Sequence, residues 1–270
     1  MEFRVNAASE RYLKRLAPRM EGWLDIYSAR VIARLLEHQS ASDLHGGLLE
    51  IGVHHGKLFL LMALNARPGE ALLACDLFGM QEENVDRSGE GDRAVFLANA
   101  KRAGIDPSRI TAMERNSLTV RPEEISQAAG GPIRFASIDG GHTAEITAND
   151  LRLVDATLDP RGAVALDDVF NQYWPDVAAG LFRYLAGPEA RLVPFAISQN
   201  KTYLARKEMA EEYREHLARN CKPGLQRRKI LLGNEVLVLH ALTMFDRATD
   251  RPLALDLMLR GLRRRLGAMR

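Results

Sequence analysis

Four residues in the middle of the chain are of types that could hold a metal ion and move a proton. Asp139 ends a strand-like run, His142 follows three residues later, and Asp167 and Asp168 end the next strand-like run. Adjacent strands of a sheet lie about 4.8 Å apart, so these three carboxylates would repel one another unless a cation lay among them. A hard divalent ion such as Mg²⁺ prefers oxygen ligands. The spacing therefore predicts a metal site formed by Asp139, Asp167 and Asp168.

The role of His142 is open at this point. A histidine beside metal-binding carboxylates could act as a general base, or it could cap the helix that is expected to follow it. The acids have structural alternatives too, because Asp168 could cap the next helix and Asp139 could hydrogen-bond its own loop. A zinc site of His54, His55 and His142 lacks any recognised ligand spacing and is disfavoured.

A second group of residues could bind a nucleoside. Glu50 lies in the first strand-like run, Gly52 and Gly56 stand in the turn after it, and Asp76 ends the second run. Glycines suit a tight turn that a ligand approaches closely, and an acid at the end of the second strand can accept both ribose hydroxyls. A plain turn and a helix N-cap are the structural alternatives. The turn is not G-x-G-x-x-G, which speaks against a nicotinamide dinucleotide.

Short apolar strands alternate with helical segments through the middle of the chain. This alternation predicts βαβ units and a buried parallel sheet, with ligands at the carboxyl ends of its strands. The last two strands are separated by only three residues, 198–200, so they must form an antiparallel hairpin. The expected strands are 48–52, 71–76, 110–113, 133–139, 163–167, 192–197 and 201–205, and the expected helices are 9–40, 58–66, 93–103, 143–158 and 174–185.

The predicted fold class is therefore α/β, a doubly wound sheet that ends in an antiparallel hairpin. An N-terminal helical segment, 1–45, precedes the sheet domain, 46–206. The remainder, 207–270, is predicted to be an appendage. It should contain a helix at 208–220, a hairpin at 229–239 and a helix at 253–266.

Composition narrows the function classes. The 270 residues include 37 Lys plus Arg and 35 Asp plus Glu, and the net charge of +2 does not favour nucleic acid as a partner. The longest stretch without Asp, Glu, Lys or Arg is 236–245, whereas a membrane-spanning helix needs about 20 apolar residues. The charged N-terminus is unlike a signal peptide. Cys75 and Cys221 form no disulfide framework, so a reducing, cytoplasmic setting is expected.

These motifs together resemble those of the class I S-adenosylmethionine-dependent methyltransferases. The resemblance rests on Glu50-Ile51-Gly52-x-x-x-Gly56, Asp76, Asp139-Gly-Gly-His142, Asp167-Asp168 and the terminal hairpin, and it covers about 46–206. Within the class the chain is most similar to the cation-dependent O-methyltransferases that modify sugars and macrolides. His142 stands where catechol-type members generally have Lys. His54 stands where the common turn has its middle glycine.

The resemblance implies a role for each residue type. Asp139, Asp167 and Asp168 would hold Mg²⁺ or Mn²⁺, with Asp139 also near the cofactor, and His142 would take the proton from the acceptor hydroxyl. Glu50 would face the amino group of the methionine moiety. The remaining cofactor contacts would come from the turn glycines, the ribose-binding acid and the adenine-binding pair, which are Gly52, Gly56, Asp76, Asn116 and Ser117.

The expected function is thus a cation-dependent O-methyltransferase that acts on a small polar acceptor, a sugar or another natural product. A non-catalytic cofactor-binding or scaffold protein of the same fold is the main alternative, and a nicotinamide-dependent oxidoreductase is a weaker one. The arginine-rich C-terminus, 260–270, could be a solvated helix face or could contact an anionic lipid surface. A homo-oligomer is compatible with the sequence.

Overall fold

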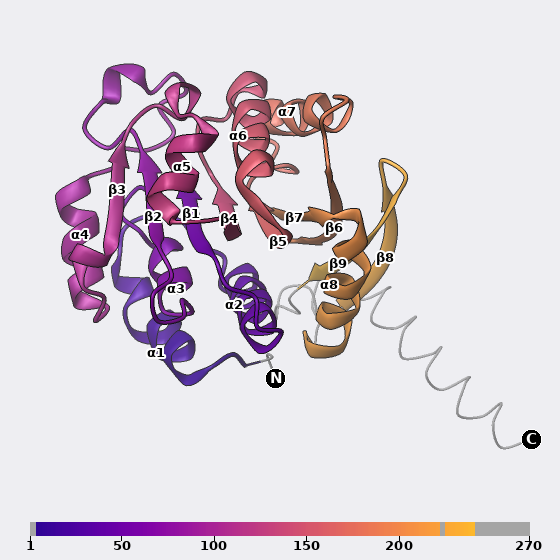
Figure 1. Cartoon of the computed structure of the whole chain (residues 1–270), viewed down its shortest axis with the longest axis horizontal. Helices are drawn as coiled ribbons and strands as arrows, with labels where there is room; N and C mark the ends of the chain where they lie inside the picture. Colours follow the sequence, from indigo (N-terminus) through magenta and orange to yellow (C-terminus); the bar gives the residue numbers. More distant parts are fainter. Residues whose placement is uncertain (1–3, 222–224, 241–270) are drawn as a thin grey trace, which may run out of the picture.

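A nine-stranded sheet forms the centre of the protein in the computed structural model, which describes residues 4–221 and 225–240 (Figure 1). The strand order is β3-β2-β1-β4-β5-β7-β6-β9-β8, and β1 to β5 run parallel. The strands are β1 (Gly47–Ile51), β2 (Leu72–Asp76), β3 (Ile110–Glu114), β4 (Ile133–Ile138), β5 (Leu158–Leu166), β6 (Leu192–Ser198), β7 (Lys201–Arg206), β8 (Leu225–Leu231) and β9 (Asn234–His240). The predicted α/β fold with five parallel strands and a terminal hairpin is confirmed.

Helices cover both faces of the sheet, as expected for a parallel sheet buried on two sides. Side chains on one face pack against α1 (Ala7–Arg15), α2 (Ile26–Ala41), α3 (Phe59–Ala63), α4 (Arg93–Arg102) and α8 (Lys207–Asn220). Side chains on the other face pack against α5 (Pro122–Ala129), α6 (Ala144–Thr157) and α7 (Pro175–Leu185). The strands alternate between the two cores, so that Leu48 faces the first layer and Leu49 the second.

The N-terminal helical segment is interrupted, and the prediction of one helix over 9–40 is wrong. Helix α1 ends at Arg15, a short 3-10 turn spans Ala17–Arg19, and α2 begins only at Ile26. Pro18 cannot continue an α-helix, and Gly22 adopts a φ of 107°. Asp25 then caps α2 by accepting a hydrogen bond from the Ser28 N–H. The apolar spacing over 9–40 is genuine, but it belongs to two helices that pack on the same core.

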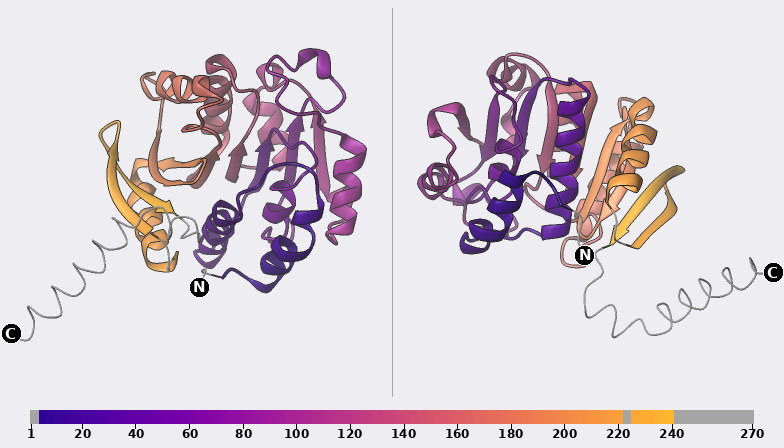
Figure 2. Two further views of the ribbon diagram at one scale, coloured as in Figure 1. Left: turned by 180° about the vertical axis from the view of Figure 1, so that it is seen from behind. Right: turned by 90° about the horizontal axis from the view of Figure 1, so that it is seen from below.

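The C-terminal part of the described chain joins the central sheet. The expected hairpin at 229–239 is present as β8 and β9, and β9 pairs in parallel with β6. Figure 2 shows α8 and this hairpin at the end of the sheet that carries β6. The helix expected at 253–266 and the arginine-rich stretch 260–270 lie outside the described residues. No helix among the described residues is long and apolar enough to cross a lipid bilayer.

The carboxyl ends of the central strands are aligned by backbone hydrogen bonds. The N–H of Gly52 donates to Cys75, and the N–H of Asp139 donates to Ile51 across the β1–β4 pair. The N–H of Asp167 likewise donates to Ile138 across the β4–β5 pair. Polar residues that are far apart in the sequence are thereby placed on one edge of the sheet.

Candidate active site

A cavity of about 750 Å³ opens at this edge of the sheet. Its walls come from the ends of β1, β2, β4 and β5 and from the loops that follow them, and Trp23 joins them from the segment before α2. Most of the predicted site residues line it, namely Gly52, Asp76, Asn116, Ser117, Asp139, His142, Asp167 and Asp168. Glu50 and Gly56 do not.

Glu50 lies beneath the cavity rather than in its wall. The residue is 2% exposed on β1, and its Oε2 atom has no hydrogen-bond partner within the described part of the chain. Burial and the negative charge of Asp139 raise the pKa of Glu50 well above its usual value, although the Lys201 charge opposes this shift. A buried carboxyl oxygen without a partner fits a ligand that brings a hydrogen-bond donor or a positive charge.

The turn after β1 needs its glycines because the protein itself crowds them. Gly52 has a φ of 81°, and a Cβ there would lie 1.8 Å from the Asp139 carbonyl oxygen. Gly56 has a φ of 85°, and a Cβ there would lie 2.4 Å from the Phe96 ring. The expected tight turn is present. Packing within the protein already requires both glycines; Gly52 lines the cavity, whereas Gly56 packs against Phe96 and does not line it.

Asp76 holds this turn in place. One carboxyl oxygen accepts hydrogen bonds from the N–H groups of Val53 and His54, at 2.6 and 2.7 Å, and the other accepts from Phe78. These bonds tie the end of β2 to the β1 turn, so Asp76 is not a cap of the next helix. His54, at the middle of the turn, has a φ of 50°, a strained conformation for a residue with a side chain.

Asn116 and Ser117 form another part of the wall, just after β3. The Asn116 side chain accepts a hydrogen bond from the Leu118 N–H and donates one to Glu83, at 3.0 and 2.8 Å. The Ser117 carbonyl accepts a hydrogen bond from Asn149, which lies on α6. This stretch is therefore a preformed surface of the cavity.

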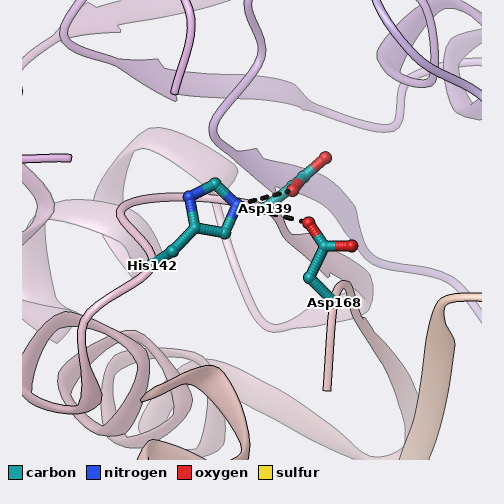
Figure 3. Close-up of side chains that lie close together, drawn as sticks. All are labelled: Asp139, His142 and Asp168. Carbon is teal, nitrogen blue, oxygen red and sulfur yellow. Dashed lines mark ion pairs between the residues drawn. The ribbon is translucent and has the colours of Figure 1, made fainter. Parts of the chain in front are cut away.

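A cluster of two acids and one histidine faces the cavity (Figure 3). The Nε2 atom of His142 lies 3.3 Å from an Asp168 carboxyl oxygen and 3.9 Å from an Asp139 carboxyl oxygen. Within residues 4–221 and 225–240 this is the one group of side chains whose potential ligand atoms meet the spacing for a metal ion, all lying within 4.8 Å of one another. His54 and His55 do not join His142, so the disfavoured zinc site is not formed.

Asp86 and Trp174 hold the imidazole of His142, and the sequence analysis assigned neither of them a role. The Nδ1 atom lies 2.9 Å from an Asp86 carboxyl oxygen, which also accepts the His142 backbone N–H. Because a carboxylate can only accept, Nδ1 carries the hydrogen and Nε2 faces Asp139 and Asp168. The Trp174 ring stacks on the imidazole at 4.2 Å and an interplanar angle of 18°.

The alternative in which His142 caps the helix that follows it is wrong, because another residue caps α6. The N-cap of α6 is Thr143, whose side-chain oxygen accepts a hydrogen bond from the Ile146 N–H. Burial lowers the pKa of His142, but the hydrogen bonds with Asp168 and Asp86 outweigh it and raise the pKa to about 9. The same contact with His142 keeps the pKa of Asp168 below its usual value despite burial.

Asp167 faces a different partner from the one predicted. Its Oδ2 atom contacts the Nζ atom of Lys201, which lies at the start of β7. The Lys201 side chain is 3% exposed and the Asp167 side chain 8% exposed. Burial lowers the pKa of Lys201, but the charges of Asp167 and Asp139 outweigh it and raise the pKa. Lys201, which comes from the terminal hairpin, therefore supplies part of the positive charge that the sequence analysis expected from a metal ion.

The residues present nevertheless fit a divalent ion. Asp139 and Asp168 offer carboxyl oxygens on one side of the cavity, and Asp167 stands beside Asp139 at the end of the same strand pair. Burial and the adjacent Asp167 raise the pKa of Asp139 well above its usual value, although the charge of Lys201 opposes this shift. Oxygen donors of this kind suit Mg²⁺ or Mn²⁺.

Comparisons with known proteins find a matching domain model and similar folds. A family model described as "Methyltransferase domain" matches residues 49–169. No curated protein sequence matches the chain. Among solved structures, the O-methyltransferase NovP aligns with a TM-score of 0.55 and 16% identity, covering 67% of this chain and 80% of its own. TomG from Streptomyces achromogenes, in complex with SAM, aligns with a TM-score of 0.51 and 14% identity, covering 76% of this chain and 91% of its own.

A third solved structure, an O-methyltransferase from Bacillus cereus in complex with SAH, aligns with a TM-score of 0.51 and 14% identity. It covers 74% of this chain and 90% of its own. At these identities the likeness establishes the fold. The chain therefore shares the fold of these O-methyltransferases, with the strand order β3-β2-β1-β4-β5-β7-β6, and its residues 49–169 match a methyltransferase domain.

Proposed function

We propose that the protein is a methyltransferase that transfers the methyl group of S-adenosylmethionine to a hydroxyl of a small polar acceptor. The acceptor is a sugar or another natural product, and the reaction uses Mg²⁺ or Mn²⁺. The observation that carries this proposal is the imidazole of His142, which is held by Asp86 and directed at two carboxylates in the cavity wall. A hydroxyl needs a base and charge stabilisation to become a nucleophile. The imidazole can act as the base, and a divalent ion held by the carboxylates would supply the charge stabilisation.

S-adenosylmethionine is proposed to bind along the ends of β1, β2 and β3. The buried, unpartnered carboxyl oxygen of Glu50 supports a role toward the methionine amino group. Asp76 lines the cavity at the end of β2, where an acid can accept ribose hydroxyls. Asn116 and Ser117 are proposed to face the adenine, on the preformed surface after β3.

His142 is proposed to be the general base. The acceptor hydroxyl gives its proton to Nε2, while Asp86 keeps Nδ1 protonated and stabilises the imidazolium that results. The acceptor oxygen then attacks the methyl carbon in line as the carbon–sulfur bond breaks, and its electron pair passes to sulfur. The products are the methyl ether and S-adenosylhomocysteine, and the proton remains on His142 until it exchanges with solvent.

Asp139 and Asp168 are proposed to hold the divalent ion, and Asp167 is the third proposed ligand. A bound divalent ion would lower the pKa of the acceptor hydroxyl and offset the charge of the acids around His142. Asp167 can contribute only an oxygen that the Lys201 ammonium does not occupy. Asp168 is oriented for this role by hydrogen bonds from Asn171 and Asn200.

The test of this function combines binding and turnover. Calorimetry should show S-adenosylmethionine binding and no NADH binding, and mass spectrometry of glycoside and polyol acceptors should show a mass gain of one methylene with release of S-adenosylhomocysteine. Excess chelator should abolish transfer and leave cofactor binding intact. Binding of NADH alone would refute the class of reaction, and full turnover in chelator would refute the role of the metal.

Two variants of His142 separate a base from a structural residue. His142→Ala and His142→Gln should both lower kcat by about 10²–10⁴-fold, the usual contribution of a general base. Cofactor affinity should stay the same, because neither variant touches the proposed cofactor contacts. If Gln retained activity and Ala did not, the side chain would be needed only for its hydrogen bond.

A further inference from the structure

A fully buried acid lies directly behind one wall of the cavity. Asp150, on α6, is 0% exposed, and its Oδ2 atom has no hydrogen-bond partner within the described part of the chain. Burial raises the pKa of Asp150 to about 7, although hydrogen bonds with the side chains of Ser117 and Asn149 oppose this shift. Burying a carboxyl without a full set of partners costs folding free energy, which points to a role beyond stability.

The neighbours of Asp150 line the cavity. A Cβ on Gly140 would lie 2.9 Å from the Asp150 Oδ2 atom. Burial and the charge of Asp150 raise the pKa of Cys75 to about 12. Cys75, Ser117 and Gly140 all belong to the cavity wall, at or just after the ends of β2, β3 and β4. Asp150 itself does not line the cavity, so it can act on a ligand there only through one of these neighbours.

Ser117 is the neighbour whose polarity Asp150 can set. Ser117 is 8% exposed, and its side chain hydrogen-bonds to the Asp150 carboxyl. A carboxylate can only accept hydrogen bonds, whereas a hydroxyl carries one hydrogen and can also accept. The hydroxyl hydrogen of Ser117 therefore points to Asp150, and the hydroxyl oxygen is left as an acceptor toward the cavity.

Asn149 fixes the rest of this arrangement. Its Nδ2 atom donates to the Ser117 carbonyl oxygen and to Asp150 Oδ1, at 3.3 Å each. Two successive residues of α6 thus hold both the backbone and the side chain of Ser117. Once the backbone is fixed, the direction of the hydroxyl hydrogen is what remains to be set, and the carboxylate of Asp150 sets it.

We propose that Asp150 is a positioning residue that makes Ser117 a hydrogen-bond acceptor toward the adenine, so that the site selects the 6-amino group of that base. This inference rests on the proposed function, which places the adenine at Ser117. A base with an oxygen at position 6 would bring a second acceptor to the Ser117 oxygen, and neither atom could donate. A site with a fixed acceptor rejects a ligand that lacks the matching donor.

Calorimetry with two ligands tests this proposal. S-adenosylhomocysteine carries a 6-amino group, and S-inosylhomocysteine carries an oxygen at that position. The titrations are made at about pH 8.5, where Asp150 is ionised. The wild type should bind the adenosyl ligand at least about tenfold more tightly than the inosyl ligand. In Asp150→Asn the amide can donate to Ser117 and release the hydroxyl hydrogen to the cavity, and in Ser117→Ala the hydroxyl is absent. Both variants should lose most of the preference.

A buried acid on the same helix provides the matched control. Asp155 is 3% exposed on α6, accepts a hydrogen bond from the Tyr184 hydroxyl and does not line the cavity. Asp155→Asn should lose stability and keep the preference of the wild type for the adenosyl ligand.

The ratio of the two affinities separates positioning from a merely structural role. If Asp150→Asn weakened both ligands by the same factor, Asp150 would only support the wall, and the proposal would be overturned. An unchanged preference in Ser117→Ala would overturn it as well, and that result does not depend on whether Asp150→Asn folds. A wild type that binds both ligands equally would refute this inference alone, whereas a wild type that does not bind S-adenosylhomocysteine would refute the proposed function with it.

Discussion

Replacing Lys201 by Met should destabilise the protein and strengthen its affinity for divalent ions at the same time. The Lys201 ammonium contacts Asp167 in a place where both side chains are almost fully buried. The charges of Asp139 and Glu50 also act on it. Lys201→Met keeps the length and shape of the aliphatic stem and removes only the charge, so that buried acids lose their shared cation.

The size of the stability effect follows from the burial. Removing one partner of a buried ion pair leaves an uncompensated charge and costs about 3–5 kcal/mol. Removing both partners with side chains of similar shape is often close to neutral. The double variant Asp167→Asn, Lys201→Met should therefore recover most of the loss. Urea unfolding at pH 7 with an unchanged m-value would measure both effects.

The metal readout distinguishes a local charge effect from general loss of stability. Lys201→Met should bind Mn²⁺ more tightly than the wild type in an electron paramagnetic resonance titration, because a competing positive charge is gone. Arg206→Met is the matched control, since Arg206 lies on the same strand and contacts the buried Asp155. It should lose stability similarly without a change in Mn²⁺ affinity. A fully stable Lys201→Met, or one with weaker Mn²⁺ binding, would refute the reasoning.

Three further outcomes are expected. Asp76→Ala should weaken S-adenosylmethionine binding by about 1.5–3 kcal/mol in calorimetry, the range for a hydrogen bond to a charged group. An unchanged affinity would mean that Asp76 only holds the turn after β1 and does not bind the cofactor. In NMR titrations without metal the pKa of His142 should be about 9. Mg²⁺ should lower this pKa by offsetting the charge of Asp168 and Asp139. A pKa of His142 that does not change when Mg²⁺ is added would mean that the ion binds elsewhere. Burial, with the charge of nearby His38, lowers the pKa of His216 to about 4, below the value in the unfolded chain, so its contribution to stability is complete above about pH 6.5 and is lost as the pH falls toward 4. His216→Gln should therefore lose less stability than the wild type between pH 7 and 5 in urea unfolding, and parallel curves would contradict this.

The local pattern of apolar residues was sufficient to predict most strands of the sheet. Apolar runs that end in Gly or Asp, separated by helical segments, predict buried parallel strands because such strands must hide both faces. The same reasoning failed where spacing alone was used, since the helix expected over 9–40 is broken at Pro18 and Gly22. It also missed α5, a short helix of eight residues whose buried side is limited to Ile125.

By itself the sequence determined that acids from β1, β2, β4 and β5 would gather at one edge, because parallel strands bring their carboxyl ends together. Only the tertiary structure decided which charges meet there. Lys201 reaches Asp167 from the terminal hairpin, and Asp86 reaches His142 from a loop 56 residues earlier in the chain. Such contacts depend on how loops and distant strands pack, and no periodicity in the sequence records that packing. The gathering of the acids was therefore predictable, whereas the buried lysine that pairs with one of them was not.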